Sequence, residues 1–180
     1  MWPFKSKSKR ASVTGIDVEQ GEIDQVGRPS PATLSQLRDG RIKLGAGLMA
    51  DPKLTEASLV TLAGADAKPS VGHGPHQSYV LPAVSLLGRA YTPSVYFTNG
   101  LVAMLTLTWA DPTRITGDPW ANWSAERERA IAKDDAKWLA TALQGLGSMT
   151  DTYTFEWGTV WSGYDEKSGF SSIGLRYNRT

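Results

Sequence analysis

The sequence predicts an α+β fold, in which an antiparallel sheet of about four strands packs on one long helix, in the order strand, strand, helix, strand, strand. Fifteen of the seventeen aromatic residues lie between Tyr79 and Tyr177, and none lies between Lys5 and Ser78. The same half of the chain holds two pairs of alternating apolar segments and one apolar stripe at helical spacing. Because aromatic side chains bury large areas and dominate cores, the packing centre is expected in this half.

A β-hairpin is predicted around Asn99 and Gly100. The flanking segments, 94–97 and 101–109, are rich in residues that favour strands, and an Asn-Gly pair adopts the positive φ angles that a tight turn needs. On the second strand, alternation places one set of side chains on a single face: Leu101, Ala103, Leu105, Leu107 and Trp109.

One long helix is predicted to begin after Ser124. Ser124 is a suitable cap, and Glu126 and Glu128 lie where the helix dipole favours anions. Gly145 and Gly147 are expected to end the helix. The face expected to pack on the sheet is apolar except at one aspartate, and consists of Ile131, Asp135, Trp138, Leu139, Ala142, Leu143 and Leu146.

A second hairpin is predicted at the carboxyl end of the chain. Residues 152–161 and 171–177 both alternate between large apolar and polar side chains, which is typical of strands with one buried face. Gly158 interrupts the first arm, and we interpret it as a β-bulge.

The chain is therefore divided into three parts. Residues 1–14 are predicted to be a flexible basic tail, residues 15–78 a peripheral segment, and residues 79–180 the α+β core. A chain that begins at Gln77 is accordingly expected to keep its sheet.

The peripheral segment itself carries local signals. Proline at the first helical position and glycine after the last predict short helices over 31–39 and 52–63. Residues 41–48 are compatible with a strand, although Gly45 and Gly47 weaken the pattern. Residues 65–78 contain glycine and proline at several positions and are interpreted as a loop.

Composition disfavours several functional classes. The chain has no cysteine, which excludes disulfides, thiolate metal sites and a cysteine nucleophile. The net charge is +1, yet four basic residues stand in the first ten, so the rest carries an excess of acids and nucleic acid is not the expected partner. No apolar run is long enough to span a membrane and no secretory signal is found, so a cytoplasmic location is expected. Trp2 and Phe4, beside those cations, allow at most a weak peripheral membrane contact.

No catalytic, metal or cofactor site is predicted. His73 and His76 stand three residues apart, but a metal site normally needs three or four ligands. The chain lacks a Gly-x-Ser-x-Gly pentapeptide, a phosphate-binding loop and a complete dinucleotide fingerprint. These observations favour a non-catalytic protein over an enzyme.

A binding surface is predicted near the tip of the second hairpin. Tryptophans ringed by polar groups are a common composition of recognition hot spots. The alternative is that both tryptophans pack beneath the helix. The residues assigned to this surface are Trp157, Trp161, Tyr164, Asp165 and Lys167.

Three functions are compatible with these patterns. The first is a small cytosolic binding protein that acts through protein–protein interaction, of the inhibitor, immunity or adaptor type. The second is an enzyme with an unrecognised Asp, Glu or His site. The third is a carbohydrate-binding or small-ligand module that uses exposed tryptophans as stacking platforms.

Overall fold

The computed structural model describes residues 36–45, 47–86, 89–110, 123–143 and 152–178. In chain order its elements are β1 (Ile42–Lys43), β2 (Met49–Ala50), α2 (Glu56–Ala63), the short 3-10 helix η1 (Gly64–Asp66), β3 (Lys68–His73), β4 (His76–Val80), β5 (Val84–Leu86), β6 (Arg89–Thr98), β7 (Leu101–Trp109), α4 (Ala125–Ala142), β8 (Thr152–Phe155), β9 (Gly158–Asp165) and β10 (Phe170–Tyr177).

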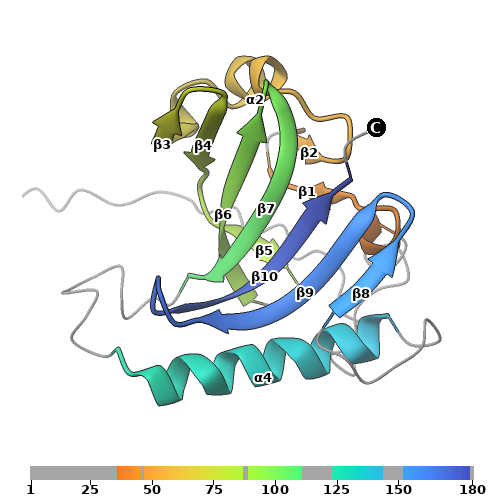
Figure 1. The fold of residues 1–180 in the computed structure, drawn as a ribbon, viewed down its shortest axis with the longest axis vertical. Coiled ribbons are helices and arrows are strands. Elements are labelled where there is room, and N and C mark those ends of the chain that lie inside the picture. The colour runs from red at the N-terminus through yellow and green to blue at the C-terminus, as the bar shows by residue number, and fades with distance from the viewer. Residues whose placement is uncertain (1–35, 46, 87–88, 111–122, 144–151, 179–180) are drawn as a thin grey trace, which may run out of the picture.

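The α+β class with an antiparallel sheet is confirmed, but the sheet is larger than predicted. Eight strands form it, in the spatial order β3-β4-β6-β7-β10-β9-β8, with β5 pairing to the start of β6 (Figure 1). Two further short strands, β1 and β2, pair with each other. The prediction of about four strands was too low, because β3, β4 and β5 were not predicted and one predicted arm is divided into β8 and β9. β3 was missed because Pro69 and Gly72 are loop signals. Such residues are tolerated at the edge of a sheet, where one side of the strand has no partner.

The central hairpin of β6 and β7 forms as predicted. Asn99 and Gly100 both have positive φ, of 54° and 75°, as the turn requires. The pairing slips once, because Tyr96 opposes Met104 whereas Phe97 opposes Val102, which leaves Ala103 as an extra residue on β7. This bulge corrects the predicted face of the strand. Val102 is buried in place of Leu101, which is 53% exposed.

The predicted carboxyl-terminal hairpin contains three strands. Residues 152–161 are divided between β8 and β9 by a turn at Glu156 and Trp157, rather than forming one bulged arm. Gly158 follows that turn and lies opposite Tyr177, with no room for a side chain because a Cβ atom would overlap the carbonyl oxygen of Arg176.

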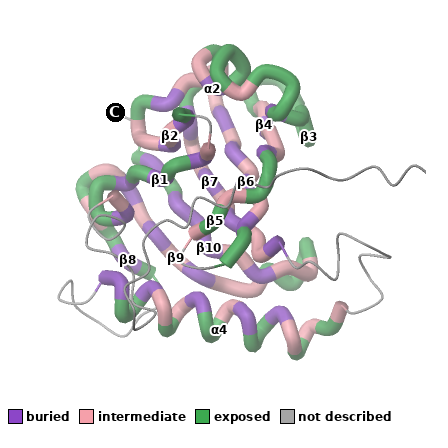
Figure 2. Tube along the Cα trace, turned by 180° about the vertical axis from the view of Figure 1, so that it is seen from behind, coloured by how far each residue is buried: buried purple, intermediate pink, exposed green. Residues whose placement is uncertain are grey.

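Helix α4 begins where the sequence predicts. Ser124 Oγ accepts a hydrogen bond from the Arg127 backbone N–H at 3.1 Å, and acidic residues occupy the first turn. The helix ends at Ala142, and the predicted terminators lie outside the described residues. Its buried residues recur at steps of three and four, facing β9 and β10 (Figure 2), and are Glu128, Ile131, Asp135, Leu139 and Ala142.

Residues 15–78, predicted to be peripheral, are called the early segment below. Its described part, from residue 36 onward, completes the core. Eight of its residues belong to the same buried cluster as Leu105, Leu139 and Ile173, namely Leu37, Ile42, Leu44, Leu48, Ala50, Leu54, Leu59 and Ala67. The loop before α2 is also tied to the central hairpin, because the Val102 N–H donates to Leu54 O at 3.0 Å. A helix does lie within the predicted range 52–63, but α2 begins at Glu56 after the Thr55 cap and not at Pro52. The predicted loop over 65–78 is wrong, because β3 and the first three residues of β4 lie there.

Candidate functional site

The two faces of the sheet differ in what covers them. Side chains alternate along each strand, so the residues between the buried ones point to the face opposite α4. We call this opposite surface the open face. It carries one row of side chains in register across four strands: Arg176 opposes Met104, Met104 opposes Tyr96, and Tyr96 opposes Ser78.

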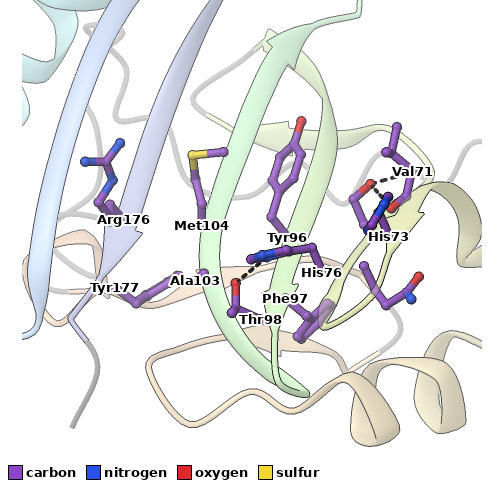
Figure 3. Close-up of a pocket in the computed structure, with 12 residues that line it drawn as sticks. Val71, His73, His76, Tyr96, Phe97, Thr98, Ala103, Met104, Arg176 and Tyr177 are labelled. Carbon is purple, nitrogen blue, oxygen red and sulfur yellow. Dashed lines mark hydrogen bonds between the residues drawn. The ribbon is translucent and has the colours of Figure 1, made fainter.

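A groove of about 560 Å³ lies over this row (Figure 3). Figure 3 shows Arg176, Met104 and Tyr96 next to one another on β10, β7 and β6. His76 and Val71, from the β4–β3 hairpin, line its other end. No aspartate or glutamate is among the described residues that line the groove.

The hairpin of β3 and β4 is held in place on one side of the groove. The Asn99 N–H donates to Pro75 O at 2.8 Å, which joins the turn of this hairpin to that of β6–β7. His76 Nδ1 lies 3.2 Å from Thr98 Oγ1. Where the β3–β4 pairing slips, Ser78 Oγ donates to Val71 O and accepts from Val71 N–H, both at 3.0 Å, which replaces the missing ladder bonds.

Trp161, on β9, extends the open face beyond the groove. It lies opposite Gly174 on β10, and its ring covers that glycine so closely that a Cβ atom there would overlap the ring. The Arg176 guanidinium carbon lies 5.6 Å from the centre of the Trp161 ring, within the range of a cation–π contact. Trp161 is partly exposed, so the side chain combines a fixed position with an accessible surface.

The other predicted tryptophan, Trp157, lies in the β8–β9 turn and contacts the early segment. Its indole N–H donates to Arg38 O at 2.6 Å, and its ring covers Gly40, whose φ is 69°. It also stacks on Phe155, with ring centres 5.2 Å apart and planes 11° apart. These contacts give Trp157 a packing role, and its part in binding stays a prediction.

The remaining predicted binding residues are at the β9–β10 turn. Asp165 Oδ1 accepts the Lys167 N–H at 3.0 Å, and this hydrogen bond lowers the pKa of Asp165. Tyr164 points to the α4 side, where the Arg129 guanidinium carbon lies 5.0 Å from its ring centre. The structure therefore places Trp157 and Asp165 at opposite ends of β9 and does not bring the five predicted residues into one cluster.

Polar groups of a different kind are buried beneath α4. Glu128 Oε2 accepts from both the N–H and the hydroxyl of Ser171, each at 2.9 Å. Asp135 Oδ1 accepts from the Tyr91 hydroxyl at 2.8 Å and from Arg89 Nη1 at 3.1 Å, while its Oδ2 has no partner among the described residues.

Burial raises the pKa values of two of these groups beneath α4, Asp135 and Tyr91. Removal from water disfavours the charged carboxylate and raises the pKa of Asp135, although the Tyr91 hydrogen bond and the Arg89 charge act in the opposite direction. Burial and the neighbouring Asp135 charge raise the pKa of Tyr91. Because these groups join α4 to the sheet from within, we interpret them as structural.

The described residues contain no group of three or more side chains able to hold a metal ion. His73 and His76 oppose each other beside the β3–β4 turn, both exposed. No helix in the described part of the chain has the length and apolar character needed to cross a membrane.

Comparison of the chain with protein-family models, with curated proteins and with solved structures found no match. The candidate site is therefore defined by its geometry alone.

Sequence reasoning missed the groove. Its residues come from five strands between Val71 and Tyr177, and their adjacency depends on how those strands pair. The available signal was the alternation on β7, where Met104 and Thr106 flank the buried Leu105.

Proposed function

We propose that the chain is a binding protein that acts through a protein–protein interaction, with its partner on the open face of the sheet. The observation that carries this proposal is the position of Trp161, whose ring is fixed over Gly174 beside Arg176 and yet is partly exposed. A side chain held in this way loses little conformational entropy when a partner covers it.

The composition of the surface supports the same proposal. Tryptophan, tyrosine and arginine are the residue types enriched in interaction hot spots, and Trp161, Tyr96 and Arg176 lie within one part of the open face. Met104 stands between the last two and can adapt its shape to a partner. The surface is built on β-strands and not on loops, so it is already in place before a partner binds.

The edge of the sheet is a weaker candidate for binding. All six residues of β3 are exposed, and Val71 is 69% exposed. However, this edge carries Lys68, Pro69 and a break in register, and these are the features with which proteins prevent an edge strand from pairing with another chain. We therefore place the partner on the face and not on the edge.

The site can be tested by photo-crosslinking in the native host. A photoreactive residue at Met104 is expected to capture one partner protein, whereas the same residue at Lys137, on the exposed side of α4, is expected to capture none. Capture from Lys137 and not from Met104 would place the interface on the α4 side of the molecule and would contradict the proposal.

A pair of glycine substitutions then tests Trp161. Gly174→Ala adds a methyl group where the indole lies, so it should displace the ring and weaken the captured partner's affinity by about tenfold or more. Gly163→Ala is the matched control on β9, because its Cβ atom would lie 4.0 Å from the ring, an ordinary contact. Affinities measured by calorimetry should differ between the two variants. Equal affinities would remove Trp161 from the interface.

A second candidate function is a carbohydrate-binding or small-ligand module. The groove volume of about 560 Å³ favours it, because small-molecule sites typically occupy about 300–1,000 Å³. Tryptophan fluorescence measured against a glycan panel, with Trp161→Phe as the reference, tests it. If a glycan changes the fluorescence of the wild type and not that of Trp161→Phe, the result supports the carbohydrate-binding or small-ligand module over the protein-binding function. The enzyme alternative stays a prediction without an assigned site.

A further inference from the structure

We propose that the partner reaches the groove with an acidic segment, in which a carboxylate binds Arg176 and a neighbouring apolar side chain packs on Met104 and Tyr96. This inference rests on the proposed function and specifies the chemistry of the partner at the same site.

Arg176 is the permanent charge of the groove among the described residues that line it. Its side chain is exposed, and no described carboxylate pairs with it. The guanidinium carbon lies 5.6 Å from the centre of the Trp161 ring, a cation–π contact that does not use the N–H groups as hydrogen-bond donors to an oxygen. A planar guanidinium with its donors in a fixed fork matches the two oxygens of a carboxylate.

The rest of the groove suits an apolar neighbour of that carboxylate. Met104 is directly opposite Arg176 in the register, and Tyr96 follows it on the next strand. An extended segment that crosses these strands can therefore place a carboxylate at Arg176 and an apolar side chain over Met104 and Tyr96, along the same row. Both side chains are partly exposed in the chain by itself, so covering them removes apolar surface from water.

Charge also selects against other partners. Because no described acid lines the groove, an acidic segment meets no like charge there, whereas a basic segment would meet the positive charge of Arg176. Nucleic acid is not favoured, because its affinity requires several clustered cations and this surface supplies one arginine.

The test compares two short probe peptides on the full-length protein. The first is the acetylated and amidated pentapeptide Gly-Phe-Glu-Leu-Gly, and the second replaces its glutamate with glutamine. Titrations are followed by NMR through the indole N–H of Trp161 and the Nε–H of Arg176. The glutamate peptide is expected to shift both signals and to bind about tenfold more tightly than its isostere, since hydrogen bonds to a charged group are worth more than neutral ones.

Variants test whether Arg176 is the group that prefers the glutamate peptide to the glutamine peptide. Arg176→Gln should abolish the preference for glutamate, while Arg176→Lys should keep part of it, as a point charge without the fork. Lys137→Gln is the control, because it removes one positive charge from the far side of α4 and should leave both affinities unchanged. Thermal unfolding of each variant confirms that it is folded.

Each outcome has one meaning. If both peptides shift the Trp161 signal equally, the open face binds peptides and the carboxylate inference is wrong. A preference that survives Arg176→Gln, or tighter binding of a single-stranded oligonucleotide, also overturns the inference. If neither peptide shifts either signal at millimolar concentration, the inference fails, and crosslinking from Met104 then decides separately whether the proposed function stands.

Discussion

The two faces of the sheet perform different tasks, as Leu105 and Met104 show. They are neighbours on β7 and point in opposite directions. Leu105 is fully buried in the core, whereas Met104 is partly exposed in the groove. The covered face holds the apolar cluster to which both α4 and the early segment contribute. The open face holds side chains that stay partly or fully exposed, such as Met104, Tyr96 and Arg176.

The buried polar residues are also concentrated on the covered face of the sheet. Of the five buried polar residues in the described part of the chain, four lie between α4 and the sheet, namely Glu128, Asp135, Ser162 and Ser171. Each has a hydrogen-bond partner across that interface or on a neighbouring strand, as buried polar groups require. Stability therefore depends on the covered face, so substitutions on the open face should change binding without unfolding the protein.

Deleting the early segment should have the largest effect. A chain that begins at Gln77 loses the eight early core residues and β3, so the part of the covered face that they pack against becomes an exposed apolar surface. Fully burying one leucine or isoleucine contributes about 1.5–3 kcal/mol, and a typical domain has only about 5–15 kcal/mol of stability. We expect this fragment to be unfolded or aggregated by circular dichroism and size-exclusion chromatography. A monomer with an intact sheet signal would show that the early segment is dispensable after all.

Neighbouring substitutions on β7 compare the two faces directly. Leu105→Ala should lower the free energy of unfolding by about 2–5 kcal/mol, because it leaves a cavity in the core. Met104→Ala should cost much less stability and should instead weaken binding at the groove. Urea denaturation measures the first effect and partner affinity the second. Similar losses of stability in both variants would contradict the division of tasks.

The smallest expected effect is on pH dependence. The pKa of Asp135 is raised in the folded state, so the folded protein binds more protons than the unfolded chain between the ordinary carboxyl pKa and the raised one. Stability from this group is therefore present at low pH and is lost as the pH rises through the folded pKa.

Asp135→Asn removes that titration and keeps an acceptor for Tyr91. The stability of the wild type relative to this variant should fall as the pH rises above the ordinary carboxyl pKa, in urea titrations at a series of pH values. A difference that does not change with pH would show that the carboxylate is equally well accommodated charged and neutral.

Local signals explain which elements could be predicted. Ser124 caps α4 and Asn99 with Gly100 forms the central turn, because a cap and a tight turn are decided by residues a few positions apart. Signals of the same local kind misled where the context was non-local. Pro69 indicated a loop, yet β3 is an edge strand, and Gly158 indicated a bulge, yet it follows a turn and lies against another strand.

The candidate site could be predicted only in part. The composition near Trp161 indicated a binding surface, and Trp161 does lie on the open face. However, Trp157 packs on Gly40, and no sequence pattern relates two residues so far apart. No local pattern marks Gly174, because its role depends on the Trp161 indole of the strand beside it.

By itself the sequence determined the fold class, the central hairpin, the start of the long helix and the absence of disulfides. These properties depend on composition, on periodicity and on contacts between residues close in the chain. The tertiary structure decided that the early segment completes the core, and that Arg176, Met104 and Tyr96 form one row beside Trp161. Strand pairing brings distant residues together, and its register is set by the packing of the whole sheet and not by any single segment.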